Sequence, residues 1–245
     1  MNEFTGKVVL ITGAARGLGA ELARLFVAGG AQVVVADVLE ETGRELAAEL
    51  GDRAVFQRLD VTRPECWDAV VDATLQHLGR LDVLINNAGI LRMGALEHFS
   101  FEDYQAVIAV NQTGCWLGMK AVLAPMKQAG GGAIVNISST GGLSGIGGFS
   151  AYVGSKFAVR GMTKCIALEY GRYGIRVNSV HPGGMATAMD PSEDNSSYAD
   201  QPIPRPGQPE EVAQLVAFLA SERASYCTGA EFVADGGLLA GKSYD

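Results

Sequence analysis

Three side chains in the middle of the chain have the types and spacing of a proton-transfer site. Ser139 follows a short apolar run, and Tyr152 and Lys156 stand four residues apart in a segment with helical periodicity. Residues four apart on a helix share a face, so the ammonium is expected one turn from the phenol. A tyrosine is a poor base at neutral pH unless a nearby positive charge stabilises its phenolate. The three residues therefore predict a tyrosine that exchanges a proton with a substrate oxygen, to which Ser139 is hydrogen-bonded.

Each of these residues also has an ordinary structural interpretation. A Tyr–Lys pair at helical spacing is more often a surface packing pair, and Ser139 could simply cap the turn that follows it. The catalytic interpretation becomes the stronger one because of a second motif, which lies near the N-terminus.

That second motif is a glycine-rich turn between a predicted strand and a predicted helix. The apolar run Val8–Ile11 leads into Gly13, Gly17 and Gly19, and helical periodicity follows. Glycine permits the backbone angles of such a turn and lets a pyrophosphate approach the start of the helix. A glycine-rich turn alone is as often a plain tight turn, but its position between strand and helix favours a dinucleotide site.

An acidic residue at the end of the second apolar run indicates which dinucleotide binds. Asp37 stands 18 residues after Gly19. A carboxylate at this place accepts hydrogen bonds from the adenosine ribose hydroxyls, and it repels the 2′-phosphate of NADP. Arg16 is the nearby cation that argues otherwise, and its expected role is to pack over the adenosine or to contact the pyrophosphate. NAD is therefore the predicted cofactor.

Strand-like and helix-like segments alternate along the chain. Apolar runs predict strands at 8–11, 32–36, 54–61, 81–86, 133–138, 175–180 and 230–233, and helical patterns lie at 17–28, 40–50, 64–78, 101–127, 152–173 and 209–220. This alternation predicts an α/β fold: a Rossmann-type doubly wound parallel sheet of about seven strands with helices on both faces, in a single domain over 1–245. The polar stretch 184–209 is expected to be a lid over the substrate, with a plain solvated loop as the alternative.

Composition excludes several classes of partner. The 245-residue chain carries a net charge of −8 and has no Lys/Arg runs, which disfavours nucleic acid and anionic membranes as partners. Four cysteines without a C-x-x-C pair and three histidines without ligand spacing predict no metal. The N-terminus lacks a basic segment, and the apolar stretch 106–126 is interrupted by polar side chains, so we expect a cytoplasmic protein without a membrane span.

The motifs in this order resemble those of the short-chain dehydrogenase/reductase family, over essentially the whole chain. They are Thr12-Gly13, Gly17-Leu18-Gly19, Asp60-Val61, Asn86-Asn87-Ala88-Gly89, Asn111, Ser139, Tyr152-x-x-x-Lys156 and Asn178-Ser179-Val180-His181-Pro182-Gly183. Segments 131–139, 157–161 and 229–233 also resemble bacterial NAD-dependent hydroxysteroid dehydrogenases of the 3α/20β and 3β/17β types.

The resemblance implies a role for each matching residue. Asn111, Ser139, Tyr152 and Lys156 would form the catalytic set, with Asn111 interrupting its helix and holding a water that links Lys156 to solvent. His181 would sit in the turn below the nicotinamide. The implied dinucleotide contacts are Gly13, Arg16, Gly17, Leu18, Gly19 and Asp37; Asp60 and Val61 at the adenine; Asn87, Ala88, Gly89, Tyr152 and Lys156 near the riboses; and Pro182, Gly183, Met185 and Thr187 around the nicotinamide.

Substrate and assembly are also expected from the resemblance. A homotetramer is implied, formed through the helices 101–127 and 152–173 and a second interface at 232–240. A lipophilic secondary alcohol or ketone is the predicted substrate, because the expected pocket residues are mainly apolar. These pocket residues are Ile90, Leu91, Met93, Gly141, Leu143, Phe149, Met185 and Met189.

Two other functions remain open on the same residues. An NADP-linked reductase of 3-oxoacyl thioesters would use the same catalytic set, and Asp37 counts against it. A non-catalytic dinucleotide-binding scaffold would keep the fold without the chemistry, and the complete set Asn111, Ser139, Tyr152 and Lys156 counts against that.

Overall fold

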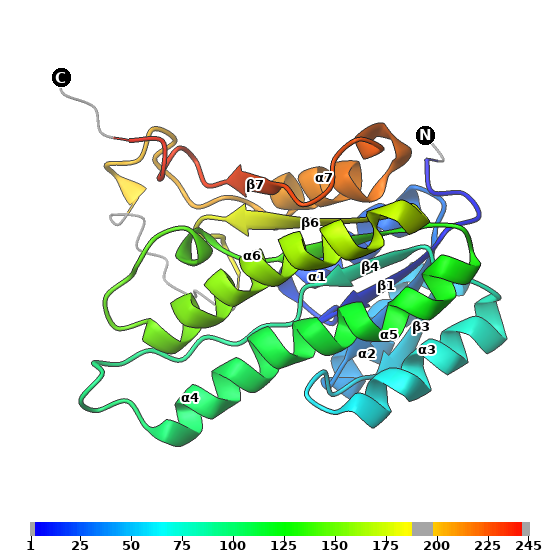
Figure 1. Ribbon diagram of the computed structural model, residues 1–245, viewed down its shortest axis with the longest axis horizontal. Helices are drawn as coiled ribbons and strands as arrows, with labels where there is room; N and C mark the ends of the chain where they lie inside the picture. Colours follow the sequence, from blue (N-terminus) through cyan, green and yellow to red (C-terminus); the bar gives the residue numbers. More distant parts are fainter. Residues whose placement is uncertain (1–2, 188–197, 242–245) are drawn as a thin grey trace.

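Seven parallel strands form one sheet with helices on both faces (Figure 1). The computed structural model describes residues 3–187 and 198–241. The sheet order is β3-β2-β1-β4-β5-β6-β7, which confirms the predicted Rossmann-type α/β fold. The strands are β1 (Val8–Thr12), β2 (Gln32–Asp37), β3 (Ala54–Arg58), β4 (Val83–Asn86), β5 (Gly132–Ile137), β6 (Ile175–Pro182) and β7 (Glu231–Ala234).

The main helices form two layers around the sheet. One core cluster joins the sheet to α1 (Gly17–Ala28), α2 (Glu40–Leu50) and α7 (Pro209–Ala220). The other joins it to α3 (Pro64–Leu78), α5 (Gly114–Gln128) and α6 (Ser150–Tyr170). Val9 and Ile11 of β1 pack in the first cluster and Val8 and Leu10 in the second. The central strands are apolar at successive positions because both of their faces are covered.

Two predicted elements end three residues before their predicted bounds. The strand predicted at 54–61 ends at Arg58, because Asp60 starts a side-chain turn in which its Oδ1 accepts the Thr62 N–H at 3.0 Å. The helix predicted at 152–173 begins at Ser150, ends at Tyr170 and continues only as a short 3₁₀ turn over Gly171–Tyr173.

The single helix predicted at 101–127 is interrupted. It consists of α4 (Phe101–Val107), a π-helical turn over Ile108–Thr113, and α5. Ser100 caps its start by accepting the Asp103 N–H at 3.0 Å. The break lies at Asn111, where the resemblance implied one, and a π turn rotates the side chains after it relative to those before it.

The packing of α5 on β4 depends on the missing side chain of Gly118. A Cβ added there would lie 2.6 Å from the Trp67 ring and would also collide with the Asn86 amide. Helix propensity alone predicts that Gly118→Ala stabilises the fold by about 1 kcal/mol, whereas overpacking costs about 1–3 kcal/mol. We expect a net loss of up to about 2 kcal/mol in the free energy of unfolding, measured by urea denaturation. A higher urea midpoint for the variant would contradict this packing.

Candidate active site

The predicted catalytic residues come from loops and helices at the carboxyl ends of the central strands. Ser139 follows β5, Tyr152 and Lys156 lie in the first turns of α6, and Asn111 lies in the π turn before α5. The loops after β4, β5 and β6 gather at this end of the sheet (Figure 1). Ligand sites of open parallel sheets lie at the carboxyl ends of their strands.

Ser139 and Tyr152 border one space. Ser139 starts a 3₁₀ turn, and its Oγ accepts the Gly141 N–H at 3.1 Å. A Cβ added at Gly141 would stand 3.5 Å from Ser139 Oγ and 3.5 Å from Tyr152 Cε1. The hydroxyl oxygen already accepts a bond from its own turn, so its proton is available to donate to a substrate oxygen.

Lys156 is held beneath this space. Its side chain is 4% exposed, and its Nζ donates to the Ile137 carbonyl at 2.9 Å. Nζ lies 5.5 Å from the centre of the Tyr152 ring. The Ser138 hydroxyl donates to the Lys156 carbonyl at 3.1 Å, which ties the start of α6 to the end of β5. A fixed, buried ammonium thus lies close to the phenol, as the spacing predicted.

Asn111 joins the π turn to the loop after β4. Its Oδ1 accepts the Ile90 N–H at 2.8 Å, while its Nδ2 donates to the Ile90 carbonyl at 3.0 Å and to Ser155 Oγ at 3.2 Å. A Cβ added at Gly89 would lie 3.5 Å from Asn111 Oδ1 and 3.6 Å from Lys156 Nζ. The structure therefore brings Asn111 Oδ1 and Lys156 Nζ close to the same point beside Gly89.

The glycine-rich turn is braced against the same β4 loop. Asn87 Nδ2 donates to the carbonyls of Thr12 and Gly13, each at 3.0 Å. Gly13 has φ +61°, and a Cβ there would lie 2.8 Å from Ala88 Cα. Glycine is required at this position because the backbone angle is left-handed and because a Cβ would collide with Ala88.

The start of α1 fits a pyrophosphate. Arg16 stands at the N-cap with an extended backbone and an exposed side chain, and the small or apolar residues Gly17, Leu18 and Gly19 follow it. A Cβ added at Gly17 would lie 3.7 Å from the Thr187 methyl group, so the segment after β6 covers this turn. Small residues leave the first N–H groups of the helix open to an anion, whose charge the helix dipole favours.

Asp37 is a buried carboxylate fixed beside the turn. Its Oδ2 accepts the Ala15 N–H at 2.9 Å, and its Oδ1 accepts the Leu39 N–H at 3.0 Å. Asp60 lies two residues after the end of the neighbouring strand β3. A hydrogen bond from the Thr62 hydroxyl holds the pKa of Asp60 below its ordinary value. Val61 follows, and its carbonyl accepts the Trp67 indole N–H at 3.0 Å. These are the residues predicted at the adenosine end of the dinucleotide site, and the structure places them after the neighbouring strands β2 and β3.

The residues predicted around the nicotinamide lie at the end of β6 and just after it. Pro182 is the last residue of β6, and the Gly183 N–H donates to the Ala234 carbonyl at 3.0 Å. Met185 forms an isolated bridge with Gly207, and the Thr187 N–H donates to the Met185 carbonyl at 2.8 Å. Both ends of the predicted lid 184–209 are thus anchored, whereas Met189 and the rest of 188–197 lie outside the described residues.

His181 lies deeper than the sequence suggested. It is buried in β6, with Nδ1 3.0 Å from the Ser139 carbonyl and Nε2 2.9 Å from Ser179 Oγ. A carbonyl only accepts, so Nδ1 carries the proton and donates to Ser139. Burial lowers the pKa of His181, which keeps the ring neutral. His181 therefore positions the backbone of Ser139, a role that its place in the motif did not reveal.

This burial predicts a pH dependence of stability. The pKa of His181 lies below its ordinary value of 6.5 in the folded protein, so its stabilising contribution is complete above that value and is lost as the pH falls below it. His181→Asn keeps an N–H donor for Ser139 but removes the titration. The stability of the wild type relative to this variant should fall below about pH 6.5, by up to about 1.4 kcal/mol per pH unit. A pH-independent difference in urea denaturation would contradict the assignment.

One residue beside Ser139 and Tyr152 was not predicted from the sequence. Ile146 Cδ1 would lie 3.6 Å from a Cβ added at Gly141, the point that Ser139 and Tyr152 also border. Ile146 stands alone among glycines in the loop before α6, so it belongs to no periodic apolar pattern that could have marked it. Of the expected pocket residues, Gly141 is buried, Leu143 and Phe149 are half-buried, and Met93 is exposed.

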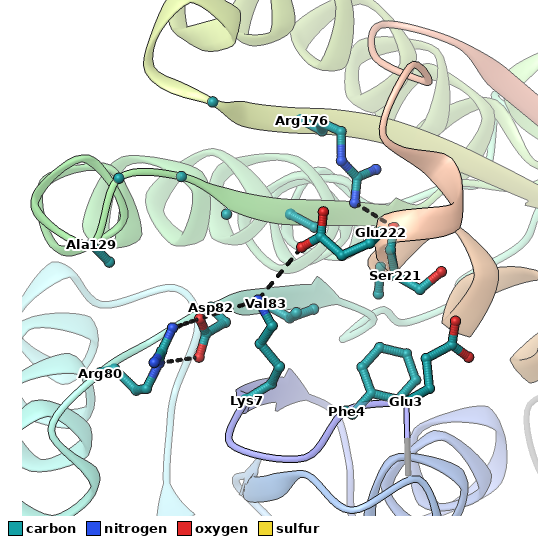
Figure 2. A pocket seen from close by; sticks show the side chains of 16 residues that line it. Glu3, Phe4, Lys7, Arg80, Asp82, Val83, Ala129, Arg176, Ser221 and Glu222 are labelled. Carbon is teal, nitrogen blue, oxygen red and sulfur yellow. Dashed lines mark hydrogen bonds and ion pairs between the residues drawn. The ribbon is translucent and has the colours of Figure 1, made fainter. Parts of the chain in front are cut away.

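A cavity of about 240 Å³ lies elsewhere, at the amino ends of β4, β5 and β6 (Figure 2). Its charged groups have structural partners. Lys7 pairs with Glu222 at 3.5 Å, and Arg176 donates to the carbonyls of Leu219 and Ser221 at the end of α7. The cavity lies at the amino ends of the strands, and the predicted catalytic residues lie at the carboxyl ends. Because its charged groups have partners within the protein, we assign the cavity a structural role.

Residues 3–187 and 198–241 offer neither a metal site nor a membrane span. No group of His, Cys, Asp or Glu in these ranges is arranged to hold a metal ion. No helix within them is long and apolar enough to cross a membrane.

Comparison with known proteins shows which family the chain belongs to. Residues 13–239 match the family described as enoyl-(acyl carrier protein) reductase. The chain is 49% identical over 240 residues to 3-alpha-(or 20-beta)-hydroxysteroid dehydrogenase of Mycobacterium tuberculosis, covering 98% of this chain and 92% of the relative. It is 44% identical over 246 residues to trans-4-hydroxycyclohexanecarboxylate dehydrogenase of Sinomonas cyclohexanicum, covering 97% and 94%.

A solved structure extends the likeness to three dimensions. Levodione reductase superposes with a TM-score of 0.91 at 36% identity, covering 96% of this chain and 98% of that one. The family match, the identity to dehydrogenases over nearly the full length, and the shared fold agree with the order of motifs in the sequence. The chain therefore belongs to the short-chain dehydrogenase/reductase family, whose members are nicotinamide-dependent oxidoreductases.

Proposed function

We propose that the protein is an NAD-dependent dehydrogenase that interconverts a lipophilic secondary alcohol, a hydroxysteroid or a similar alicyclic alcohol, with its ketone. The observation that carries this proposal is the space bordered by Ser139 Oγ and Tyr152 Cε1, each 3.5 Å from one point, with the buried Lys156 beneath it. The names of two relatives support the substrate class, because a hydroxysteroid and a hydroxycyclohexanecarboxylate are both ring-bearing alcohols.

In the oxidation direction, the chain's own residues handle the substrate oxygen and its proton. When bound, NAD supplies the acceptor for the hydride that leaves the carbinol carbon. Ser139 donates a hydrogen bond that fixes the substrate oxygen, and Tyr152 accepts the hydroxyl proton as the carbonyl forms. The Lys156 ammonium stabilises the phenolate form of Tyr152. Asn111, placed beside Gly89 and Lys156, is positioned to support a water through which the proton leaves to solvent.

The preference for NAD rests on Asp37 in this proposal. The carboxylate is buried and held by the Ala15 and Leu39 N–H groups, so it cannot swing away from a ligand at the end of β2. Two ribose hydroxyls satisfy its remaining lone pairs, whereas a 2′-phosphate would place like charges together.

Initial rates across a substrate panel test the proposed function. The panel contains 3-, 17- and 20-hydroxysteroids, simple alicyclic and acyclic secondary alcohols, and 3-hydroxyacyl thioesters, each with NAD and with NADP. We expect NADH formation with ring-bearing alcohols. Thioester turnover with NADP would instead favour the acyl-reductase alternative, and NAD binding without turnover of any substrate would favour a scaffold.

Assembly as a homotetramer is part of the proposal. Along α6, the exposed residues Phe157, Gly161 and Leu168 recur at helical spacing, and Trp116 is exposed on the neighbouring α5. Leu168, in the last turn of α6, is 86% exposed in the single chain, and an apolar side chain so fully exposed on a helix fits burial by a second copy. The unpaired cysteines fit the reducing cytoplasm, where we place the enzyme.

Leu168→Glu should break this assembly. A carboxylate on each copy would meet its counterpart across an apolar contact, so we expect the mass measured by light scattering to fall from that of a tetramer to that of a dimer or monomer. Val55→Glu, on the edge strand β3, introduces the same charge away from α5 and α6 and should leave the mass unchanged. An unchanged mass for Leu168→Glu would contradict the interface.

A further inference from the structure

The space between Ser139 and Tyr152 can hold one carbon atom at the Cβ position of Gly141. A methyl group at the Cβ position of Gly141 would lie 3.5 Å from Ser139 Oγ, 3.5 Å from Tyr152 Cε1 and 3.6 Å from Ile146 Cδ1. These are ordinary van der Waals distances, so a carbon atom fits there without strain in the protein. That carbon belongs either to a residue at position 141 or to the substrate, and never to both.

The 3₁₀ turn that contains Gly141 is held in place by hydrogen bonds and by packing on α6. The Gly141 N–H is bound to Ser139 Oγ, and the Gly142 N–H donates to the Ser139 carbonyl at 2.8 Å. A Cβ added at Gly142 would lie 2.9 Å from the Lys156 carbonyl oxygen, so this part of the loop already rests on α6. The loop therefore cannot retreat to make room for a larger residue at position 141.

The outer part of the same loop is apolar and faces the loop after β4. The Gly94 N–H donates to the Gly148 carbonyl at 2.8 Å, which joins the two loops. Met93, Leu96 and Ile146 are 69%, 80% and 40% exposed, respectively, on these two loops. Exposed apolar side chains on two joined loops, one of which carries Ile146 to the edge of the space, suit a hydrocarbon skeleton that extends out of the site.

Given the proposed function, on which this inference rests, we infer that Gly141 is the residue that sets substrate bulk beside the reacting carbon. The missing side chain leaves room for a substituent on the carbon next to the carbinol, and Ile146 closes the far side of that room. The chain is thereby adapted to secondary alcohols that are branched or ring-fused next to the carbinol, as in a polycyclic skeleton.

Two probe alcohols isolate this position. Cyclohexanol has no substituent next to its carbinol, and 2-methylcyclohexanol has one. Gly141→Ala should lower kcat/KM for 2-methylcyclohexanol relative to cyclohexanol by about 10- to 100-fold, the range for one methyl group in a filled pocket. Ile146→Ala should shift the ratio in the opposite direction. Gly147→Ala adds the same methyl group to the same loop, where it meets nothing within 4 Å among the described residues, and should leave the ratio unchanged.

The outcomes separate this inference from the proposed function. NAD affinity, measured for each variant, shows whether the dinucleotide end is intact. A ratio that Gly141→Ala leaves unchanged, with or without an equal loss on both alcohols, overturns the inference and leaves the proposed function standing. Wild-type protein that binds NAD and oxidises neither these alcohols nor the hydroxysteroids overturns the proposed function and the inference with it.

Discussion

Tyr152→Phe is expected to lower kcat by about 10²- to 10⁴-fold while NAD affinity changes only slightly. The substitution removes the phenol oxygen and keeps the ring, whose edge lies beside the Gly141 position, 3.5 Å from an added Cβ. Without that oxygen, the substrate hydroxyl must lose its proton to water, while the Ser139 hydrogen bond and the position of Lys156 remain. The measurement is kcat for the best alcohol of the panel, together with NAD affinity.

Tyr170→Phe is the matched control, because it makes the same change near the far end of α6, where Tyr170 packs on Tyr173. It should retain wild-type turnover. Tyr152→Phe with more than about a tenth of wild-type kcat would show that another group exchanges the proton, since the loss would fall below the usual range for such catalysis.

Asp37→Asn is expected to raise the NADP-to-NAD ratio of kcat/KM by about 10²-fold. The variant keeps the shape and one oxygen at position 37 but removes the negative charge that opposes a 2′-phosphate. Juxtaposed like charges cost several kcal/mol, and each 1.4 kcal/mol corresponds to a factor of ten. The asparagine also weakens one of the bonds to the Ala15 and Leu39 N–H groups, so NAD use should fall as NADP use rises.

Asp52→Asn removes an equal charge from the 3₁₀ turn after α2 and should leave the ratio unchanged. If the charge acted only through the long-range field of the protein, both substitutions would change the NADP-to-NAD ratio of kcat/KM by the same factor. If the Asp37→Asn ratio stays at the wild-type value, or if the wild type itself prefers NADP, the assignment of cofactor choice to Asp37 is wrong.

The sequence predicted those parts of the fold whose signals are local. Pro64 and Pro209 mark the first turns of α3 and α7, and Gly79 ends α3 in a left-handed conformation, so these helices have the predicted bounds. Leu59-Asp60-Val61 imitates a strand by its alternation, but β3 ends before it. The Asp60 side-chain bond to the Thr62 N–H competes with strand pairing, and alternation does not show this.

The sequence predicted those site residues whose type is fixed by the chemistry they perform. It did not predict those whose position is fixed by packing between distant segments. The residue types and spacing suggest Ser139, Tyr152 and Lys156, the glycine-rich turn makes their catalytic interpretation the stronger one, and the structure brings the three to the same end of the sheet. The contact of His181 with the Ser139 carbonyl depends on the registration of β6 beside β5, and the place of Ile146 depends on the path of a glycine-rich loop. Both are long-range consequences of folding that no local pattern of residues encodes.

The double hydrogen bond between Asn111 and Ile90 makes one backbone amide a natural reporter of the active site. The Ile90 N–H is bound to a buried side chain and not to a strand, so it exchanges with solvent deuterium only when the π turn separates from the β4 loop. The deuterium uptake of that single amide measures how often the two segments part. It does so in the unmodified protein, without substrate, and on a timescale of minutes to hours that turnover assays average away.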